Sequence, residues 1–226
     1  VGSEMCIRDR ITTSKKIFLS ILAGAAIAFG GLTYLFLKSV TSVILASFCF
    51  SIGLIIVLVF SLWLFTGKIG YAFDKEFSVL DFIIMFFGNF LGAVTIGYIA
   101  YFVLKDTNMY VINLNTSISK LDNFNFVNLL LSGIVCGGFV YAAVEAYKFK
   151  KLNIILRIIL VVAFIGTFVY LSLNHCVANM FYFSFASCWS FRALLFILVN
   201  TLGNSIGAII LNTIKNLVVN LVNKKQ

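Results

Sequence analysis

Charged residues are scarce in this chain of 226 residues, of which 11% are Asp, Glu, Lys or Arg. Soluble domains carry roughly 25%, whereas the hydrophobic fraction here is 62% and the mean hydropathy is +1.07. This composition excludes an ordinary soluble domain and indicates a polytopic protein of the lipid bilayer. The net charge of +9 does not indicate a nucleic-acid partner, because the basic residues lie at the ends of apolar segments and not on one face.

Metal-ligating and disulfide-forming residues are also few. The chain contains one histidine, and its five cysteines form no Cys-x-x-Cys pair. Buried cysteine behaves as a small hydrophobic residue, so the sequence predicts no disulfide framework, no metal site and no other cofactor. The cysteines are Cys6, Cys49, Cys136, Cys176 and Cys188.

The single histidine, His175, lies at the end of a long apolar segment. An ionisable side chain at bilayer depth is costly, and it usually faces a pore or a partner group. Imidazole also changes charge near neutral pH, which makes His175 the first candidate functional residue. The alternative is a neutral imidazole that hydrogen-bonds between helices. A catalytic dyad with Cys176 is not predicted, because adjacent residues of a helix point in different directions.

Six apolar segments are long enough for membrane-spanning helices, which need about 20 residues. A shorter apolar piece, 177–189, follows His175 directly, so we expect the fifth span to be a broken helix. We expect the second span to break at Thr66-Gly67-Lys68 and to resume weakly over 69–73. Irregular backbone at membrane depth is tolerated only where it lines a cavity or is packed in protein. The six segments are 17–37, 40–65, 79–104, 124–147, 152–173 and 193–214.

The distribution of basic residues predicts the topology. With a cytoplasmic N-terminus, 13 of the 17 Lys and Arg residues lie inside and 4 outside. The positive-inside rule therefore places both termini in the cytoplasm and the protein in the cytoplasmic membrane. Residues 1–10 are polar and unlike the rest, and we interpret them as a sequence artefact or leader. The transmembrane domain is then 11–218, followed by a cytoplasmic tail, 219–226.

The sequence contains an internal repeat. Residues 88–93 of the third span, Gly-Asn-Phe-Leu-Gly-Ala, recur as Gly-Asn-Ser-Ile-Gly-Ala at 203–208 in the sixth. The breaks in the second and fifth spans also correspond, with Thr66 equivalent to His175. Three helices per half invert the second half relative to the first, a pattern typical of transporters and channels. Small residues also centre the first and fourth spans, at 23–31 and 132–138, and we expect the glycines to serve helix packing.

One motif suggests a different class of protein. Residues 203–207 fit Gly-x-Ser-x-Gly, the nucleophile elbow of serine hydrolases. The context does not fit, because the motif lies mid-helix with no preceding strand, and Phe90 replaces Ser205 in the other copy of the repeat. We therefore predict that the protein is not an enzyme. An intramembrane hydrolase that uses Ser205 and His175, or a membrane scaffold without transport activity, remain the alternatives from other classes.

Five motifs, in order along residues 17–214, resemble those of the formate/nitrite transporter family. The resemblance implies an aquaporin-like fold of six transmembrane helices in two inverted repeats. It also implies a homopentamer with one pore per protomer, and transport of small monovalent anions. The motifs are Leu64-Phe65-Thr66-Gly67, Gly88-Asn89-x-x-Gly92, Gly133-Ile134-Val135-Cys136, His175-x-x-Ala178-Asn179-Met180-Phe181 and Thr201-Leu202-Gly203-Asn204-x-Ile206-Gly207.

The same resemblance assigns residues to the pore. Thr66 and His175 would form a polar centre, and Phe65, which precedes Thr66 in the loop of the second span, is also assigned to the pore. Lys120 lies about one residue from the position of an entrance lysine. Three departures from the family pattern, Trp63, Gly137 and Asn174, remove polar groups from that centre. The residues implied as apolar constrictions are Phe50, Leu54, Leu64, Val140 and Phe168.

The implied mechanism follows from solvation. A bare anion crosses an apolar constriction at a cost of several kcal/mol, whereas a neutral weak acid does not carry that penalty. We expect a basic vestibule to attract the anion and a proton to reach it near His175, directly or through water. Thr66 would donate a hydrogen bond. Formate is the first choice of substrate, and nitrite, hydrosulfide and short carboxylates such as acetate or lactate are the alternatives.

Overall fold

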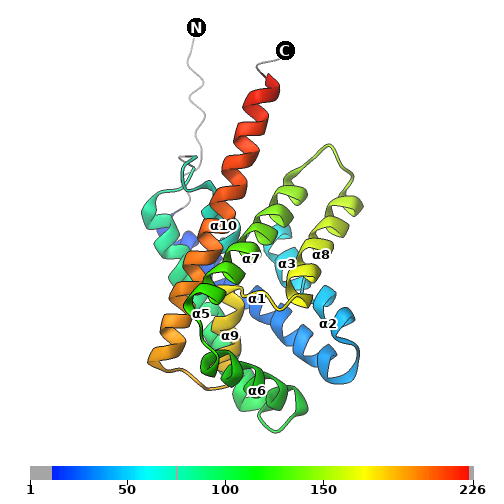
Figure 1. Cartoon of the computed structure of the whole chain (residues 1–226), viewed down its shortest axis with the longest axis vertical. Coiled ribbons are helices and arrows are strands. Elements are labelled where there is room, and N and C mark those ends of the chain that lie inside the picture. The colour runs from blue at the N-terminus through cyan, green and yellow to red at the C-terminus, as the bar shows by residue number, and fades with distance from the viewer. Residues whose placement is uncertain (1–11, 75, 224–226) are drawn as a thin grey trace.

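The computed structural model describes residues 12–74 and 76–223, and every regular element in these ranges is helical (Figure 1). The predicted all-α class is therefore confirmed for these residues. The segment 1–10, interpreted above as an artefact, lies outside the described residues. The elements are α1 (Thr13–Val40), α2 (Val43–Cys49), α3 (Ile52–Val59), α4 (Phe65–Lys68), η1 (Ile69–Tyr71), α5 (Val79–Leu104), α6 (Asn108–Asp122), α7 (Phe126–Lys148), α8 (Ile154–Tyr170), α9 (Cys176–Phe185) and α10 (Phe191–Asn223).

Among the described residues, four helices are long and apolar enough to cross a membrane: α1, α5, α7 and α10. Helix α5 coincides with the predicted span 79–104, and α10 runs nine residues past the predicted end at 214. The second and fifth predicted spans are divided into shorter helices, α2 to α4 and α8 to α9. The count of six spans therefore stays a prediction.

Serine residues end three of the helices, and no proline is available to do so. Helices α3, α8 and α9 are followed by serines with a left-handed backbone, at φ values of 52°, 55° and 50°. After each serine, the next N–H donates to a carbonyl five residues earlier, which is the Schellman pattern of hydrogen bonds. The breaks that follow α3 and α8, inside the second and fifth predicted spans, thus begin with turns of the same type. The serines are Ser61, Ser172 and Ser187.

The structure corrects the position of one predicted break. The helical stretch α3 ends at Val59 and the irregular segment is 60–64, so Thr66-Gly67-Lys68 lies in the short helix α4. The prediction was wrong because Ser61 turns the chain earlier, and because a buried side chain accepts the Phe65 N–H and starts α4. The predicted break near His175 is confirmed, with irregular residues 171–175 between α8 and α9.

Helix α6 was not predicted from the sequence. Its buried residues recur every four positions and so form one stripe that faces the protein. Two of the four are polar, so the segment gives no run of apolar residues for hydropathy to detect. The buried residues are Met109, Asn113, Ser117 and Leu121.

Glycines allow two helix pairs to pack at backbone distance. A Cβ atom on Gly24 of α1 would overlap the Asn89 carbonyl of α5, and one on Gly137 of α7 would overlap the Asn204 carbonyl of α10. The structure therefore aligns Gly24 with Gly137. The expected packing role of the small residues fits this close approach.

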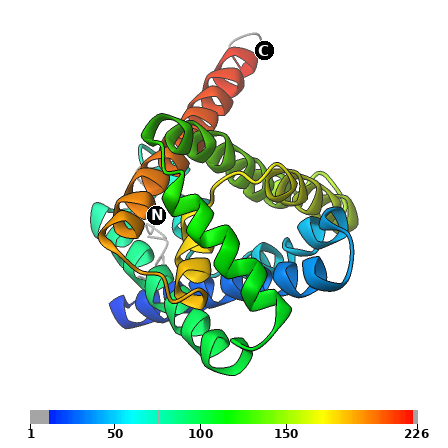
Figure 2. The same cartoon turned by 60° about the horizontal axis from the view of Figure 1, so that its bottom comes forward.

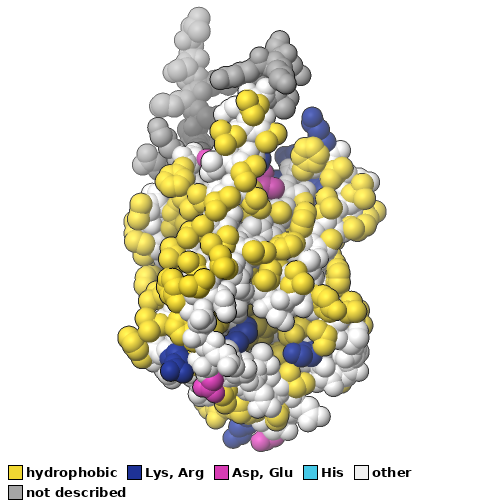
Figure 3. Space-filling model, in the orientation of Figure 1, with side chains coloured by type: hydrophobic (Ala, Val, Ile, Leu, Met, Phe, Trp, Pro, Cys, Tyr) yellow, Lys and Arg dark blue, Asp and Glu magenta, His cyan; other side chains and the backbone are white. Residues whose placement is uncertain are grey.

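Helix α9 is enclosed by the rest of the protein. Figure 2 shows it surrounded by the longer helices, and all of its residues except Tyr182 are buried. Around this core, the outer surface is largely apolar, as Figure 3 shows for one face. Phe102 and Phe191 are 73% and 76% exposed. A surface with so many exposed large apolar residues suits lipid or a neighbouring protein and not water.

We expect Gly137→Ala to destabilise the protein, because the added methyl group must push α7 away from the backbone of α10. Overpacking of this kind costs about 1–3 kcal/mol. Gly138→Ala is the matched control, since its Cβ would lie 3.3 Å from a movable side-chain atom of Leu211. Thermal unfolding in detergent should show a lower melting temperature for the first variant alone. Equal melting temperatures would contradict the packing argument.

Candidate functional site

Two buried asparagines hold the beginnings of the short helices. At the beginning of α4, the Asn89 side-chain oxygen accepts the Phe65 N–H at 2.7 Å. Its amide nitrogen donates to the carbonyls of Ser20 and Trp63 at 2.7 and 2.8 Å. One side chain thus joins α1, α5, the irregular segment and α4. All its bonds serve backbone groups that water cannot reach at this depth.

Asn204 repeats the arrangement in the second half of the chain. Its oxygen accepts the Cys176 N–H at 2.9 Å, and its nitrogen donates to the carbonyls of Gly133 and Asn174 at 2.8 and 2.9 Å. The two copies of the Gly-Asn motif therefore form matching sets of hydrogen bonds.

These bonds also define the register of the two halves. Phe65 is equivalent to Cys176, and the residue before each, Leu64 or His175, is the N-cap of its helix. The predicted equivalence of Thr66 with His175 is wrong by two residues. The prediction matched the two breaks by their polar residues, whereas the asparagine bonds match Leu64 with His175. Thr66 and His175 meet in space although they come from different positions of the repeat.

Thr66 and His175 form a buried hydrogen-bonded pair. The Thr66 Oγ1 and His175 Nε2 atoms are 2.8 Å apart, and the residues are 0% and 4% exposed. The Nδ1 atom of His175 accepts the Ala178 N–H at 3.2 Å, so the proton of the neutral ring is on Nε2. Nε2 therefore donates to Thr66, whose own hydroxyl proton has no acceptor among the described residues.

Two phenylalanines extend from this pair. The Phe168 ring stacks on His175 with centroids 6.0 Å apart and an angle of 27° between planes. Phe50 meets Phe168 edge to face at 6.0 Å. Both phenylalanines are 2% exposed. The predicted constriction residues Phe50 and Phe168 thus lie directly beside the predicted polar centre.

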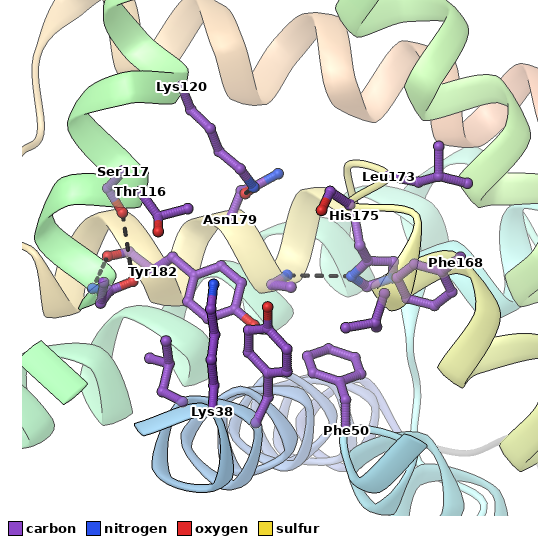
Figure 4. Close-up of a pocket in the computed structure, with 16 residues that line it drawn as sticks. Lys38, Phe50, Thr116, Ser117, Lys120, Phe168, Leu173, His175, Asn179 and Tyr182 are labelled. Atoms are coloured by element: carbon purple, nitrogen blue, oxygen red, sulfur yellow. Dashed lines mark hydrogen bonds between the residues drawn. The ribbon is translucent and has the colours of Figure 1, made fainter. Parts of the chain in front are cut away.

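A cavity of about 100 Å³ lies beside these aromatic rings, and we call it the α6 cavity (Figure 4). Its walls come from α1, α6, α8 and α9, and they include Phe50, Phe168 and His175. Two lysines, Lys38 and Lys120, also line it, and the lining contains no carboxylate. The cavity therefore offers positive charge next to the phenylalanines.

A second cavity of about 160 Å³, the α4 cavity, is walled by α3, α4 and α7. Its lining includes Leu54, together with Leu64 and Gly67 from either side of Thr66. The Thr66–His175 pair thus lies between the two cavities. Two lysines are present here as well, and again the lining has no carboxylate; they are Lys68 and Lys148.

Lys120 is positioned by α6. Its Nζ atom donates to Asn179 Oδ1 of α9 at 2.8 Å and lies 5.8 Å from the centre of the Tyr182 ring. Burial, with a smaller contribution from the charge of Lys38, lowers the pKa of Lys120 to about 8. The sequence had only placed this lysine near an entrance.

Neither Phe65 nor Val140 lines the α6 cavity or the α4 cavity. The Phe65 ring packs against Phe82 and Phe86 of α5, so only its N–H takes part in holding α4. Val140 is buried on α7 and is 1% exposed, but neither cavity includes it in its lining.

The three departures from the family pattern have different surroundings. The Trp63 ring packs on Phe77, with Lys16 over its face. Asn174 donates to Ser132 Oγ from both its backbone and its side chain, at 3.0 and 3.1 Å. Gly137 faces the backbone of α10, where an added Cβ atom would overlap the Asn204 carbonyl.

A polar cluster fastens the segment that follows Thr66. The hydroxyl of Tyr71 in η1 donates to Glu145 of α7, and Lys215 of α10 bonds the same carboxylate at 3.0 Å. Asn212 of α10 donates to Asp74 at 2.8 Å. Helix α4 is thus held by Asn89 at its beginning and by this cluster after its end.

The hydrolase alternative has no geometric support. The Ser205 hydroxyl donates to the Thr201 carbonyl one turn earlier in α10, at 2.8 Å. His175 directs its two ring nitrogens at Thr66 and Ala178. A serine nucleophile needs a base within hydrogen-bonding reach, and Ser205 has none there.

The fold and site define a helical membrane protein whose buried Thr–His pair separates two lysine-lined cavities. The formate/nitrite transporter family model matches residues 4–218, and the chain belongs to that family. The family consists of transporters and channels, not enzymes. A search of curated proteins finds no match.

Solved structures support the same fold. One, described as a pentameric formate channel with formate bound, has 21% identity and a TM-score of 0.77, over 92% of this chain and 97% of its own. Another, described as an ion channel of the same family, has 18% identity and a TM-score of 0.76, over 90% and 89% of the two chains.

Sequence reasoning missed Asn89 and Asn204 as functional residues, although it identified the repeat that contains them. The signal that could have found them was an asparagine in the middle of each of two apolar helices, each of which follows a broken span.

We expect Asn204→Ala to lower the free energy of unfolding by about 2–4 kcal/mol, since each buried backbone group left unpaired costs about 1–3 kcal/mol.

Asn115→Ala is the control for this substitution, because Asn115 is exposed on α6. Amide hydrogen exchange should show faster exchange over 174–178 in Asn204→Ala only. Unchanged protection in that segment would show that the asparagine does not hold the beginning of α9.

Proposed function

We propose that the chain transports small monovalent anions, with formate as the first choice, across the cytoplasmic membrane. The path in each protomer runs from the α6 cavity, past Thr66 and His175, to the α4 cavity. The observation that carries this proposal is the pair of lysine-lined cavities without carboxylates on either side of the Thr–His pair. Nitrite, hydrosulfide and short carboxylates have the same charge and are the alternative substrates.

The assembly we propose is a homopentamer with an aquaporin-like protomer. Each protomer would have six spans in two inverted halves, with α2–α4 and α8–α9 as the broken ones and both termini in the cytoplasm. The repeated bonds of Asn89 and Asn204 support two equivalent halves. The exposed apolar surface supports contacts between protomers, and the solved formate channel of similar fold is described as pentameric.

The lysines act on the anion before it loses water. A cleft lined by charges of one sign raises the local concentration of ions of the opposite sign. The α6 cavity and the α4 cavity each have two lysines. Beyond them, Phe50 and Phe168 at one end and Leu54 and Leu64 at the other would strip the ion of solvent. A charged species pays several kcal/mol there, so the neutral acid is the form that crosses.

The proton reaches the anion through water in this proposal. His175 uses its Nδ1 lone pair to cap α9, and an imidazolium in this position would direct an N–H at the Ala178 N–H. The ring therefore serves as a donor through Nε2, together with the free hydroxyl proton of Thr66. Of the two proton sources considered from the sequence, the relayed water suits this geometry better than direct transfer.

We expect purified protein in proteoliposomes to take up formate and to discriminate against anions too large for the cavities. Competition by nitrite, hydrosulfide, acetate and lactate across a range of pH will rank the substrates. Uptake should rise as the external pH falls, because one proton accompanies each anion. Liposomes with protein that take up none of these anions would favour the scaffold alternative.

We expect His175→Asn to lower formate uptake about tenfold at every pH and to keep the rise in uptake towards low pH, since one hydrogen bond to the permeant species is worth about 1.4 kcal/mol and the proton arrives through water. Asparagine still caps a helix, so α9 should remain in place. Ser205→Ala is the matched control, because this serine bonds only within α10. Wild-type uptake in His175→Asn would reduce the histidine to a packing residue.

A further inference from the structure

Two ammonium groups reach into the α6 cavity from different helices. Lys38 comes from the last turn of α1, and Lys120 comes from α6, which packs against α1 and α9. Figure 4 shows both side chains directed into the same pocket. Both side chains line this one cavity, so their positive charges face the same small space. Like charges that face each other are unfavourable without an anion between them.

Neither ammonium group is neutralised by the protein. Lys120 bonds an amide oxygen, and Lys38 lies 5.4 Å from the centre of the Tyr34 ring. The two ion pairs found among residues 12–74 and 76–223 involve other lysines, Lys16 and Lys215. The cavity lining contains no Asp or Glu. Two positive charges therefore face one small space with no negative partner.

The rest of the lining supplies hydrogen bonds suited to oxygen atoms of an anion. Tyr34 and Tyr182 both line the cavity, and their hydroxyls form no hydrogen bond within the described part of the chain. A hydroxyl without an acceptor can donate to a ligand. A volume of about 100 Å³ is several times the roughly 10–15 Å³ that one water molecule requires on the same measure. A compact ion therefore fits in this space.

We propose that the α6 cavity binds a compact oxyanion with two negative charges, such as sulfate, between Lys38 and Lys120. The bound dianion would block the path without crossing it, a consequence that rests on the proposed function. A monoanion of a weak acid becomes neutral with one proton, whereas a dianion needs two. It therefore keeps its charge at Phe50 and Phe168, where desolvation is costly.

Binding is tested first without transport, by equilibrium dialysis of radiolabelled sulfate against the purified full chain in detergent at low salt. We expect one saturable site per protomer, and binding about tenfold weaker for methyl sulfate, which has the same head group and one charge fewer. Lys38→Gln should weaken sulfate binding by about tenfold, and Lys38→Arg should retain it. Lys105→Gln is the matched control, because Lys105 is exposed after α5 and outside the cavity lining.

Three results would overturn the proposal: no saturable binding to wild-type protein, equal affinity for sulfate and methyl sulfate, or unchanged binding in Lys38→Gln. The second arm measures sulfate in formate-uptake assays. We expect sulfate to inhibit wild-type uptake without entering the liposomes, and Lys38→Gln to need about tenfold more sulfate for the same fractional inhibition. Absence of formate uptake would count against the proposed function alone, since dialysis tests the dianion site independently.

Discussion

The site depends on one constraint: backbone groups freed at a helix break inside a membrane must find partners within the protein. Asn89 and Asn204 meet this constraint: each accepts the first N–H of a short helix, and each donates to one carbonyl of the irregular segment before that helix and to one carbonyl of a long helix. The positions of α4 and α9 follow from those bonds. Thr66 and His175 can then lie 2.8 Å apart, although 109 residues separate them in the chain.

Charge and polarity are separated along the molecule. Lysines occupy the two cavities, while the pair between them is uncharged when His175 is in the tautomer that caps α9. Asn174, where the family usually has an acidic residue, bonds Ser132 and accepts from Asn179 and Asn204. The surroundings of His175 are therefore amides, hydroxyls and aromatic rings. Such a centre interacts with a permeant molecule by hydrogen bonds more than by charge.

Much of this was accessible from the sequence. Hydropathy located α5 residue for residue, and the apolar run interrupted at His175 predicted the break before α9. The proximity of Thr66, His175, Phe50 and Phe168 followed from the family resemblance. Local pattern could not predict α6, whose buried stripe is half polar, or the break at 60–64, which depends on Asn89 from a distant helix. Local pattern also could not show that the Phe65 ring packs on α5, because Phe82 and Phe86 are distant from it in sequence.

The register of the two halves separates the residues that hold the short helices from the residues that set the charge near them. Lys68 and Asn179 both lie four residues beyond the N-caps Leu64 and His175, so they are equivalent positions. One half carries its cation there, whereas the other has an amide that holds a lysine supplied by α6. Because the asparagine bonds that hold the short helices do not involve these positions, the residues at these positions can differ between the halves without loss of the common frame.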